Sequence, residues 1–195
     1  MLAKDYRAKA WTDLSGKWGT MVIVTVVYAL IIGGCNVVPG IGSIASLILQ
    51  GPLALGMAFV ALKVIRSQEI SLDDLFDGLR GNRFVPALVL SLLNALFVVL
   101  WSLLFVIPGI IKTYAYAMST YIMADNPGMS QKECREESMR MMMGNKWRLF
   151  CLHFSFIGWG LLSALTFGIL GLWVAGYMNV AEAAFYEDLK ARRAA

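Results

Sequence analysis

Few side chains in this sequence are suited to chemistry, and the most conspicuous one is Glu182. It follows the segment from Leu149 to Ala181, which contains no Asp, Glu, Lys or Arg. An ionisable group within a bilayer is costly, so Glu182 is the first candidate for a functional residue. Two interpretations are open: a proton or substrate site, or pairing at the membrane interface with a base such as Lys146 or Arg148. We favour the pairing, because further acids follow Glu182 closely.

Three other polar residues interrupt apolar sequence. Lys112 follows Pro108-Gly109 and is expected either to attract an anion or lipid phosphate or to extend its ammonium group to water. Asn94 is expected to hydrogen-bond to a neighbouring helix. Asp125, in Asp125-Asn126-Pro127, is expected to end a helix, because the residue before proline avoids helical backbone.

The sequence argues against an enzyme. Its single histidine, His153, precedes Ser155 by two residues, which points the two side chains to different sides of a helix. The three cysteines have no CxxC spacing, so neither a disulfide framework nor a zinc site is predicted. Glu136-Glu137 resembles the paired glutamates of intramembrane proteases, but its spacing to Arg140 is one residue short. We therefore expect no enzymatic activity and no cofactor.

The distribution of charge indicates an integral membrane protein. Hydrophobic residues make up 58% of the 195 residues and charged residues only 15%, against about a quarter in soluble domains. Three runs contain no Asp, Glu, Lys or Arg: Trp18 to Leu62, Phe84 to Ile111 and Leu149 to Ala181. A membrane-spanning helix needs about 20 apolar residues, so each run can hold at least one span. The net charge of +4 then indicates bases that lie close to anionic lipid headgroups, and it does not indicate binding of nucleic acid.

An internal repeat divides the single membrane domain, 1–195, into units of about 1–66, 67–126 and 127–195. Each unit opens its apolar run with a glycine, a base and an aromatic residue: Gly16-Lys17-Trp18, Gly81-Asn82-Arg83-Phe84 and Gly144-Asn145-Lys146-Trp147. A breaker follows about one membrane crossing later: Pro39-Gly40, Pro108-Gly109 and Gly168.

This pattern predicts an all-α protein of three helical hairpins with a possible pseudo-threefold arrangement. The six predicted spans are 19–35, 44–65, 84–106, 109–124, 147–166 and 169–188. The alternative is that any hairpin of this length has a turn near its middle, without a true repeat.

The bases predict the orientation. All but one of the 17 Lys and Arg residues lie before a first arm or after a second, and Lys112 is the exception. Positive charge stays cytoplasmic, so both termini are expected inside a plasma or inner cell membrane. Amphipathic helices along the cytoplasmic surface are expected at 2–14, with Tyr6, Ala10 and Leu14 on one side, and after the capping residues Ser71 and Ser130.

Several segments resemble a bacterial membrane family, domain of unknown function 975. The resemblance covers nearly the whole chain and rests on Leu72-Asp73-Asp74-Leu75-Phe76-Asp77-Gly78, Ile107-Pro108-Gly109-Ile110-Ile111-Lys112, Ala124-Asp125-Asn126-Pro127, Gly144-Asn145-Lys146-Trp147-Arg148-Leu149-Phe150, Phe154-Ser155-Phe156-Ile157-Gly158-Trp159, Leu165-Thr166-Phe167-Gly168-Ile169 and Ala184-Phe185-Tyr186-Glu187-Asp188. Gly176 departs from the proline expected in the family. The resemblance implies the fold and the membrane location, and it implies no activity.

Two functional hypotheses follow. The first is non-enzymatic binding or passage of a lipid, ion or small solute, because broken membrane helices often mark transport sites. The second is a scaffold or accessory subunit that binds a membrane protein partner through the interfacial helices and their methionines. In both cases membrane lipids are expected partners.

Overall fold

The structure is a computed structural model that describes residues 3–37, 41–104, 106–166 and 168–194. Within these ranges the chain is helical and contains no strand. The elements are α1 (Ala3–Asp13), α2 (Trp18–Asn36), α3 (Ile41–Ile65), α4 (Leu72–Phe76), η1 (Asp77–Leu79), η2 (Gly81–Arg83), α5 (Phe84–Leu104), α6 (Val106–Tyr116), α7 (Ser119–Asp125), α8 (Gln131–Met141), α9 (Lys146–Phe154), α10 (Ile157–Leu165) and α11 (Ile169–Ala194).

Four helical segments among the described residues are long and apolar enough to cross a membrane. They are Trp18–Asn36, Ile44–Ile65, Gly81–Leu103 and Lys146–Leu165. They correspond to four of the six predicted arms. The expected arm 109–124 is divided between α6 and α7, and the expected arm 169–188 lies within α11, whose second half carries acids and bases. The finding is consistent with a membrane protein.

Glycine sets several of the turns between helices. Gly16, Gly81 and Gly144 have φ angles of 81°, 44° and 77°, and Gly168, between α10 and α11, has a φ of 85°. Side chains with a Cβ rarely adopt these angles, so glycine is needed at these positions. The turn predicted at Gly168 is confirmed.

The other two predicted breakers differ from it. Pro108-Gly109 does not form the turn, because both residues lie within α6 after the chain has left α5 at Leu104. Proline is tolerated in the first turn of a helix, where no backbone N–H donor is needed. Pro39-Gly40 lies outside the described residues.

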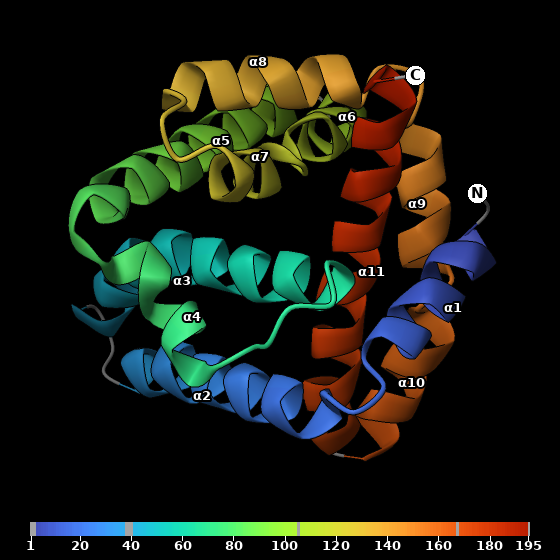
Figure 1. The fold of residues 1–195 in the computed structure, drawn as a ribbon. Helices are drawn as coiled ribbons and strands as arrows, with labels where there is room; N and C mark the ends of the chain where they lie inside the picture. The colour runs from blue at the N-terminus through green and yellow to red at the C-terminus, as the bar shows by residue number, and fades with distance from the viewer. Residues whose placement is uncertain (1–2, 38–40, 105, 167, 195) are drawn as a thin grey trace.

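The helices form three groups, each with one of the short helices beside it. In Figure 1, α2 lies along the bottom with α3 above it across the middle, α5 to α8 lie along the top, and α9 to α11 with α1 lie along the right. α1 packs against α11 and α9, α4 packs against α3 and α2, and α8 packs against α7, α5 and α6. α4 therefore packs mainly against the first group, α8 against the second and α1 against the third. Each short helix thus packs on the group that precedes it along the chain, and α1 closes the cycle on the last group.

The short helices bury one face each. Tyr6, Ala10 and Leu14 are buried, so the apolar side predicted for α1 packs against other helices of the protein. Both predicted helix starts have capping interactions: the backbone N–H of Ser71 donates to Asp74 Oδ2 at 2.9 Å, and that of Ser130 donates to Glu133 Oε2 at 2.8 Å.

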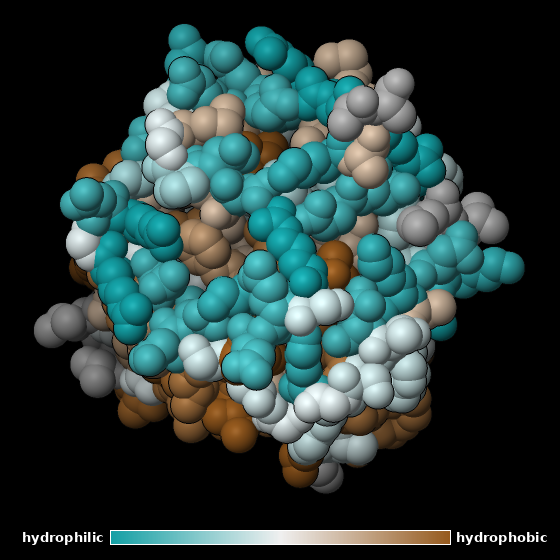
Figure 2. Space-filling model, viewed as in Figure 1, coloured by the Kyte–Doolittle hydropathy of each residue, from teal (hydrophilic) through white to brown (hydrophobic). Residues whose placement is uncertain are grey.

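Burial is concentrated at one end of the helix groups. In α3 the buried side chains lie between Leu53 and Val64, and in α11 between Tyr177 and Leu189. The opposite ends expose large apolar side chains, including Val37, Ile44, Leu103, Leu165 and Ile169. Figure 2 shows the same asymmetry: hydrophilic residues cover much of the viewed face and apolar residues gather at the lower edge. Water disfavours such an apolar surface, whereas lipid tolerates it.

Candidate functional site

Asp125 lies at the centre of a charged cluster where α3, α7 and α11 end. Its carboxylate is 2.6 Å from Arg66 Nη2, forms an ion pair with Lys190 and accepts a hydrogen bond from the Tyr186 hydroxyl at 3.1 Å. Arg66 also contacts Glu187 at 2.7 Å. We call these five residues the Asp125 cluster. As predicted, Asp125 ends a helix, but it also joins three helices, which its sequence position did not indicate.

The cations determine the charge state of Asp125. Its side chain is only 9% exposed, and burial alone would raise the pKa of the carboxyl group. The hydrogen bonds from Lys190 and Arg66 and their positive charges outweigh the burial, so the pKa of Asp125 lies below its ordinary value. The carboxylate is therefore ionised throughout the neutral pH range.

Glu182 lies in a second polar cluster, between α7, α9 and α11. Glu182 Oε1 is 2.9 Å from His153 Nε2, and the Tyr121 hydroxyl donates to Glu182 Oε2 at 3.2 Å. The Tyr114 hydroxyl lies 3.3 Å from the second ring nitrogen of His153. The expected partner was a base such as Lys146 or Arg148, and the structure brings His153 to Glu182 instead. A histidine and a tyrosine can satisfy a carboxylate, so this contact does not require a substrate.

Arg148 belongs to a third contact, between α9, α11 and α1. Its Nη2 lies 3.0 Å from Asp188 Oδ2, which also accepts a hydrogen bond from the Tyr6 hydroxyl. Burial and this hydrogen bond raise the pKa of Tyr6 well above its ordinary value. Lys146 begins α9 and is half-buried, and no acid of the described residues pairs with it within 4.0 Å.

Asn94 and Lys112 lie in the second helix group, apart from these clusters. Asn94 Nδ2 donates to Ser119 Oγ of α7 at 2.8 Å, which confirms the predicted bond to a neighbouring helix. Lys112, the one base outside the predicted cytoplasmic clusters, lies within α6. Its ammonium group lies over the rings of Trp101, at 5.0 Å, and Tyr116, at 5.9 Å, because α6 folds back along α5.

A large apolar groove lies where the first and third helix groups meet. Its volume is about 690 Å³. Its lining residues come from α1, α2, α10 and α11 and the turn before α11: Trp11, Trp18, Trp159, Thr166, Ile169, Leu170, Trp173, Val174 and Tyr177. We call this cavity the aromatic groove.

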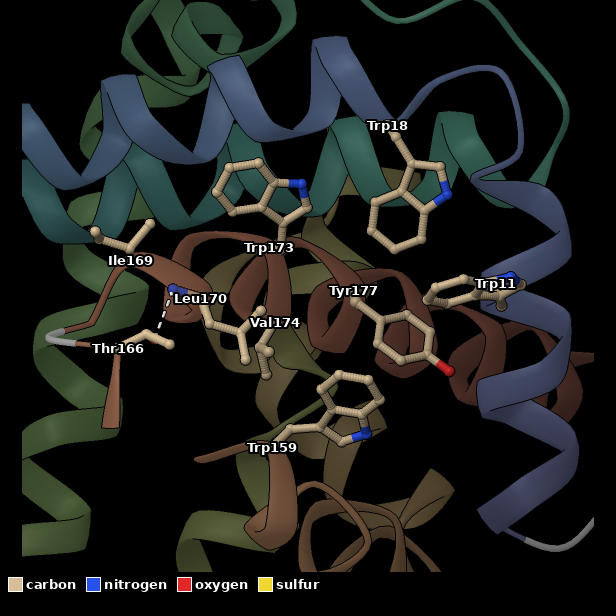
Figure 3. A pocket seen from close by; sticks show the side chains of 9 residues that line it. All are labelled: Trp11, Trp18, Trp159, Thr166, Ile169, Leu170, Trp173, Val174 and Tyr177. Atoms are coloured by element: carbon tan, nitrogen blue, oxygen red, sulfur yellow. Dashed lines mark hydrogen bonds between the residues drawn. The ribbon is translucent and has the colours of Figure 1, made fainter. Parts of the chain in front are cut away.

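The rings of the aromatic groove are arranged along its length. Figure 3 shows Trp11, Trp18 and Tyr177 gathered toward one end, and Thr166 and Ile169 at the other. The Trp11 ring packs edge-on against Trp18 at 5.0 Å and against Tyr177 at 5.7 Å between centroids. Thr166 is the groove's one aliphatic hydroxyl, and it accepts a hydrogen bond from the Leu170 N–H at 3.2 Å. The groove thus offers mainly apolar and aromatic surface to a ligand.

The groove is more apolar than a second sizeable cavity. This second cavity, of about 480 Å³, lies against the Asp125 cluster, and its lining includes the charged residues Glu137, Lys190 and Arg193. A cavity of about 140 Å³ lies between α2, α3 and α11, beside Tyr28 and Asn179, and it is much smaller than the groove. Within the described ranges, no three His, Cys, Asp or Glu side chains come together as a possible metal site. Sequence reasoning missed the groove, although four of the six tryptophans line it. Trp18 was noted only as the start of an apolar run.

Comparison with known proteins identifies the family. Residues 1–113 and 103–193 match the family described as "Protein of unknown function (DUF975)". The chain belongs to this family. No curated protein and no solved structure matches it. Membership in the DUF975 family therefore agrees with the resemblance in the sequence and assigns no activity.

Two of the segments that carry the DUF975 resemblance form contacts at the buried end of the helix groups. Asp74, of the segment Leu72 to Gly78, pairs with Lys63 of α3 at 2.7 Å. Asp125, of the segment Ala124 to Pro127, anchors the Asp125 cluster. In this chain these segments therefore join helices.

Proposed function

We propose that this chain is a multi-pass protein of the cell membrane that binds the acyl chain of a lipid in the aromatic groove, without catalysis. One observation carries the proposal: an apolar groove of about 690 Å³ with four tryptophan rings is lined in part by α2 and α10, which belong to segments long and apolar enough to cross a membrane. A ligand in this place is most simply a molecule of the surrounding bilayer. Tryptophan also favours the region where acyl chains meet headgroups.

The proposed architecture has six spans in three hairpins, which are the first, second and third helix groups. Three observations support it. The glycines that open the three apolar runs all have positive φ. The short helices α1, α4 and α8 each pack on the preceding group in a cyclic order. Arg66, Asp125 and Glu187, near the ends of the three second arms, meet in one cluster.

In this arrangement the charged, buried end faces the cytoplasm with both termini, and the exposed apolar ends lie deeper in lipid. The bases that hold the charged end together, such as Arg66, Arg148 and Lys190, support this orientation. The interfacial helices then lie beside the hairpins at the headgroup level. Their buried faces pack against protein, and their polar faces meet water and headgroups.

An acyl chain matches the groove in both chemistry and size. A methylene group moved from water into apolar surroundings contributes about 0.8 kcal/mol, and the groove volume falls within the range of small-ligand sites. An acyl chain in the bilayer already has apolar surroundings, so tight contact with the rings must replace its contacts with other lipids. A fixed aromatic wall supplies such contact through dispersion.

A groove-filling substitution tests the proposal. Val174→Phe places a ring where about two methylene groups of a bound chain would lie. Its expected effect is roughly a tenfold loss of affinity. Native mass spectrometry in mild detergent should show the parent carrying one co-purified phospholipid and the variant largely without it. Leu161→Phe is the control, because Leu161 is 66% exposed on α10 and does not line the groove.

Both variants must first melt within a few degrees of the parent. Loss of the lipid from Val174→Phe alone would support the groove. Equal retention by the parent and both variants would place the retained lipid elsewhere and overturn the proposal.

A scaffold or accessory subunit is the second candidate function, and one surface favours it. Trp147, Phe150 and Phe154 form an exposed stack along α9, with ring centroids 5.0 and 6.1 Å apart, and Met143 lies exposed just before them. Met141 and Met142 are buried, so the predicted methionine face is smaller than expected. Co-purification of one stoichiometric membrane protein that Trp147→Ala abolishes would favour this function.

A further inference from the structure

Two cations of the second helix group have no acidic partner among the described residues. Lys112 of α6 and Arg135 of α8 form no ion pair with any described acid within 4.0 Å, whereas Lys63, Arg66, Arg148 and Lys190 all do. An unpaired cation next to apolar helices is costly, so negative charge beside it is stabilising. Here no acid of the described chain provides it.

Both cations lie on one set of aromatic rings. Arg135 Cζ is 4.4 Å from the ring centroid of Phe97 and 6.0 Å from that of Tyr116. Lys112 Nζ lies 5.0 Å from the Trp101 ring and 5.9 Å from the Tyr116 ring. Both cations therefore contact Tyr116. Arg135 Cζ and Lys112 Nζ are no farther apart than the sum of their distances to the centroid of this ring. We call Phe97, Trp101 and Tyr116 the aromatic shelf.

The ring faces stabilise the cations only in part. A cation over an aromatic face is attracted to the ring, but this contact does not replace the hydrogen bonds that a guanidinium group donates. Arg135 Nε and Nη1 are buried. These two guanidinium donors have no hydrogen-bond acceptor in the described part of the chain.

We propose that Lys112 and Arg135 bind the phosphate of an anionic phospholipid headgroup on the aromatic shelf. A phosphate oxygen accepts hydrogen bonds from both a guanidinium and an ammonium group. Basic sites between membrane helices are suited to such headgroups. Partial exposure of Lys112, Arg135 and Trp101 leaves an approach from the lipid side. This site goes beyond the acyl-chain groove and lies in a different helix group.

Headgroup preference tests the site. The purified chain is mixed in detergent with equal amounts of dioleoylphosphatidylglycerol and dioleoylphosphatidylcholine, and bound lipid is counted by native mass spectrometry. The two lipids have the same acyl chains, so the aromatic groove treats them alike and only the headgroups differ. The parent should prefer the anionic lipid by roughly tenfold, since each base near a membrane surface contributes about 1 kcal/mol.

Substitutions assign the preference to the two cations. Lys112→Gln with Arg135→Gln should reduce the ratio to about one. Lys112→Arg with Arg135→Lys keeps both charges and should retain most of the preference. Lys132→Gln is the control, because Lys132 is 78% exposed on α8, the helix that also carries Arg135, and pairs with Glu136 at 3.8 Å.

Two results would overturn this inference. One is a parent that binds both lipids equally, which leaves the groove proposal intact. The other is a double Gln variant that melts like the parent and keeps its preference for the anionic lipid. If the Gln variant fails to fold, loss of the preference in the charge-keeping variant counts against the site in the same way.

Discussion

Three charged side chains in this chain are paired with residues of other helices. Glu182 meets His153, Asp125 meets Arg66 and Lys190, and Arg148 meets Asp188. The sequence identified Glu182 because charge within apolar sequence is conspicuous, Asp125 as the end of a helix, and Arg148 as a base that could pair with Glu182. It could not identify their partners, since each pair joins helices that are distant along the chain. Burial of such pairs makes the removal of one member costly.

Asp125→Asn is expected to destabilise the protein by about 2 kcal/mol at pH 7, because Arg66 and Lys190 lose their shared anion. The pKa of Asp125 is lowered in the folded chain. Its contribution is therefore fully present above the unfolded pKa of about 4 and is lost as the pH falls through the lower folded pKa. Thermal unfolding in detergent at pH 7 and pH 3 measures both effects.

The matched control for this substitution is Asp73→Asn. Asp73 is 80% exposed and lies 3.5 Å from Arg80, so its loss should change the melting temperature little. If Asp125→Asn melts like the parent at pH 7, or if the difference between them is as large at pH 3, Asp125 does not stabilise the charged end as described.

The helices pack closely where glycine allows it. An added Cβ at Gly56 of α3 would lie 1.8 Å from the Leu75 carbonyl oxygen, and one at Gly78 would lie 2.0 Å from that of Pro52. Glycine therefore allows close approach of the neighbouring backbone at Gly56. At Gly33 and Gly34 nothing lies within 4 Å of an added Cβ. Residue type alone does not show which glycines face a neighbour.

Gly56→Ala is expected to destabilise the chain by about 2 kcal/mol, because the methyl group forces α4 away from α3. Thermal unfolding measures this loss. Gly160→Ala is the control: Gly160 lies in α10 with nothing within 4 Å of an added Cβ. Alanine is the better helix former by up to about 1 kcal/mol, so this control should be unchanged or more stable. A Gly56→Ala variant as stable as the control would contradict the close packing of α3 and α4.

The sequence predicted helix boundaries best where apolar runs are long. Predicted spans 19–35, 44–65 and 84–106 correspond to α2, α3 and α5 within a few residues. It failed where polar residues or breaks divide a run. The arm 109–124 is interrupted between Tyr116 and Ser119, and Pro108-Gly109 lies within α6. Its residue type predicts that Pro108 interrupts a helix, but the chain turns earlier, where α5 ends at Leu104.

For the whole molecule, the helical class and the apolar segments follow from composition, and the groove does not. The groove exists because α1 and α2 lie opposite α10 and α11, at the two ends of the chain. No spacing in the sequence shows that Trp11 and Trp18 will face Trp159 and Trp173. In the proposed arrangement, the charged end holds the helices together at one side of the membrane and the exposed apolar ends contact lipid.

The central claim is that a lipid acyl chain occupies the aromatic groove. Photo-crosslinking tests it most directly, with a phosphatidylcholine that carries a diazirine near the end of one acyl chain, followed by peptide mapping. Labels should concentrate between Trp159 and Tyr177 and disappear from there in Val174→Phe. Leu96, Val99 and Leu100 of α5 provide an internal comparison, because each is about half exposed outside the groove. Labelling of α5 as strong as that of the groove, unchanged by Val174→Phe, would contradict the claim.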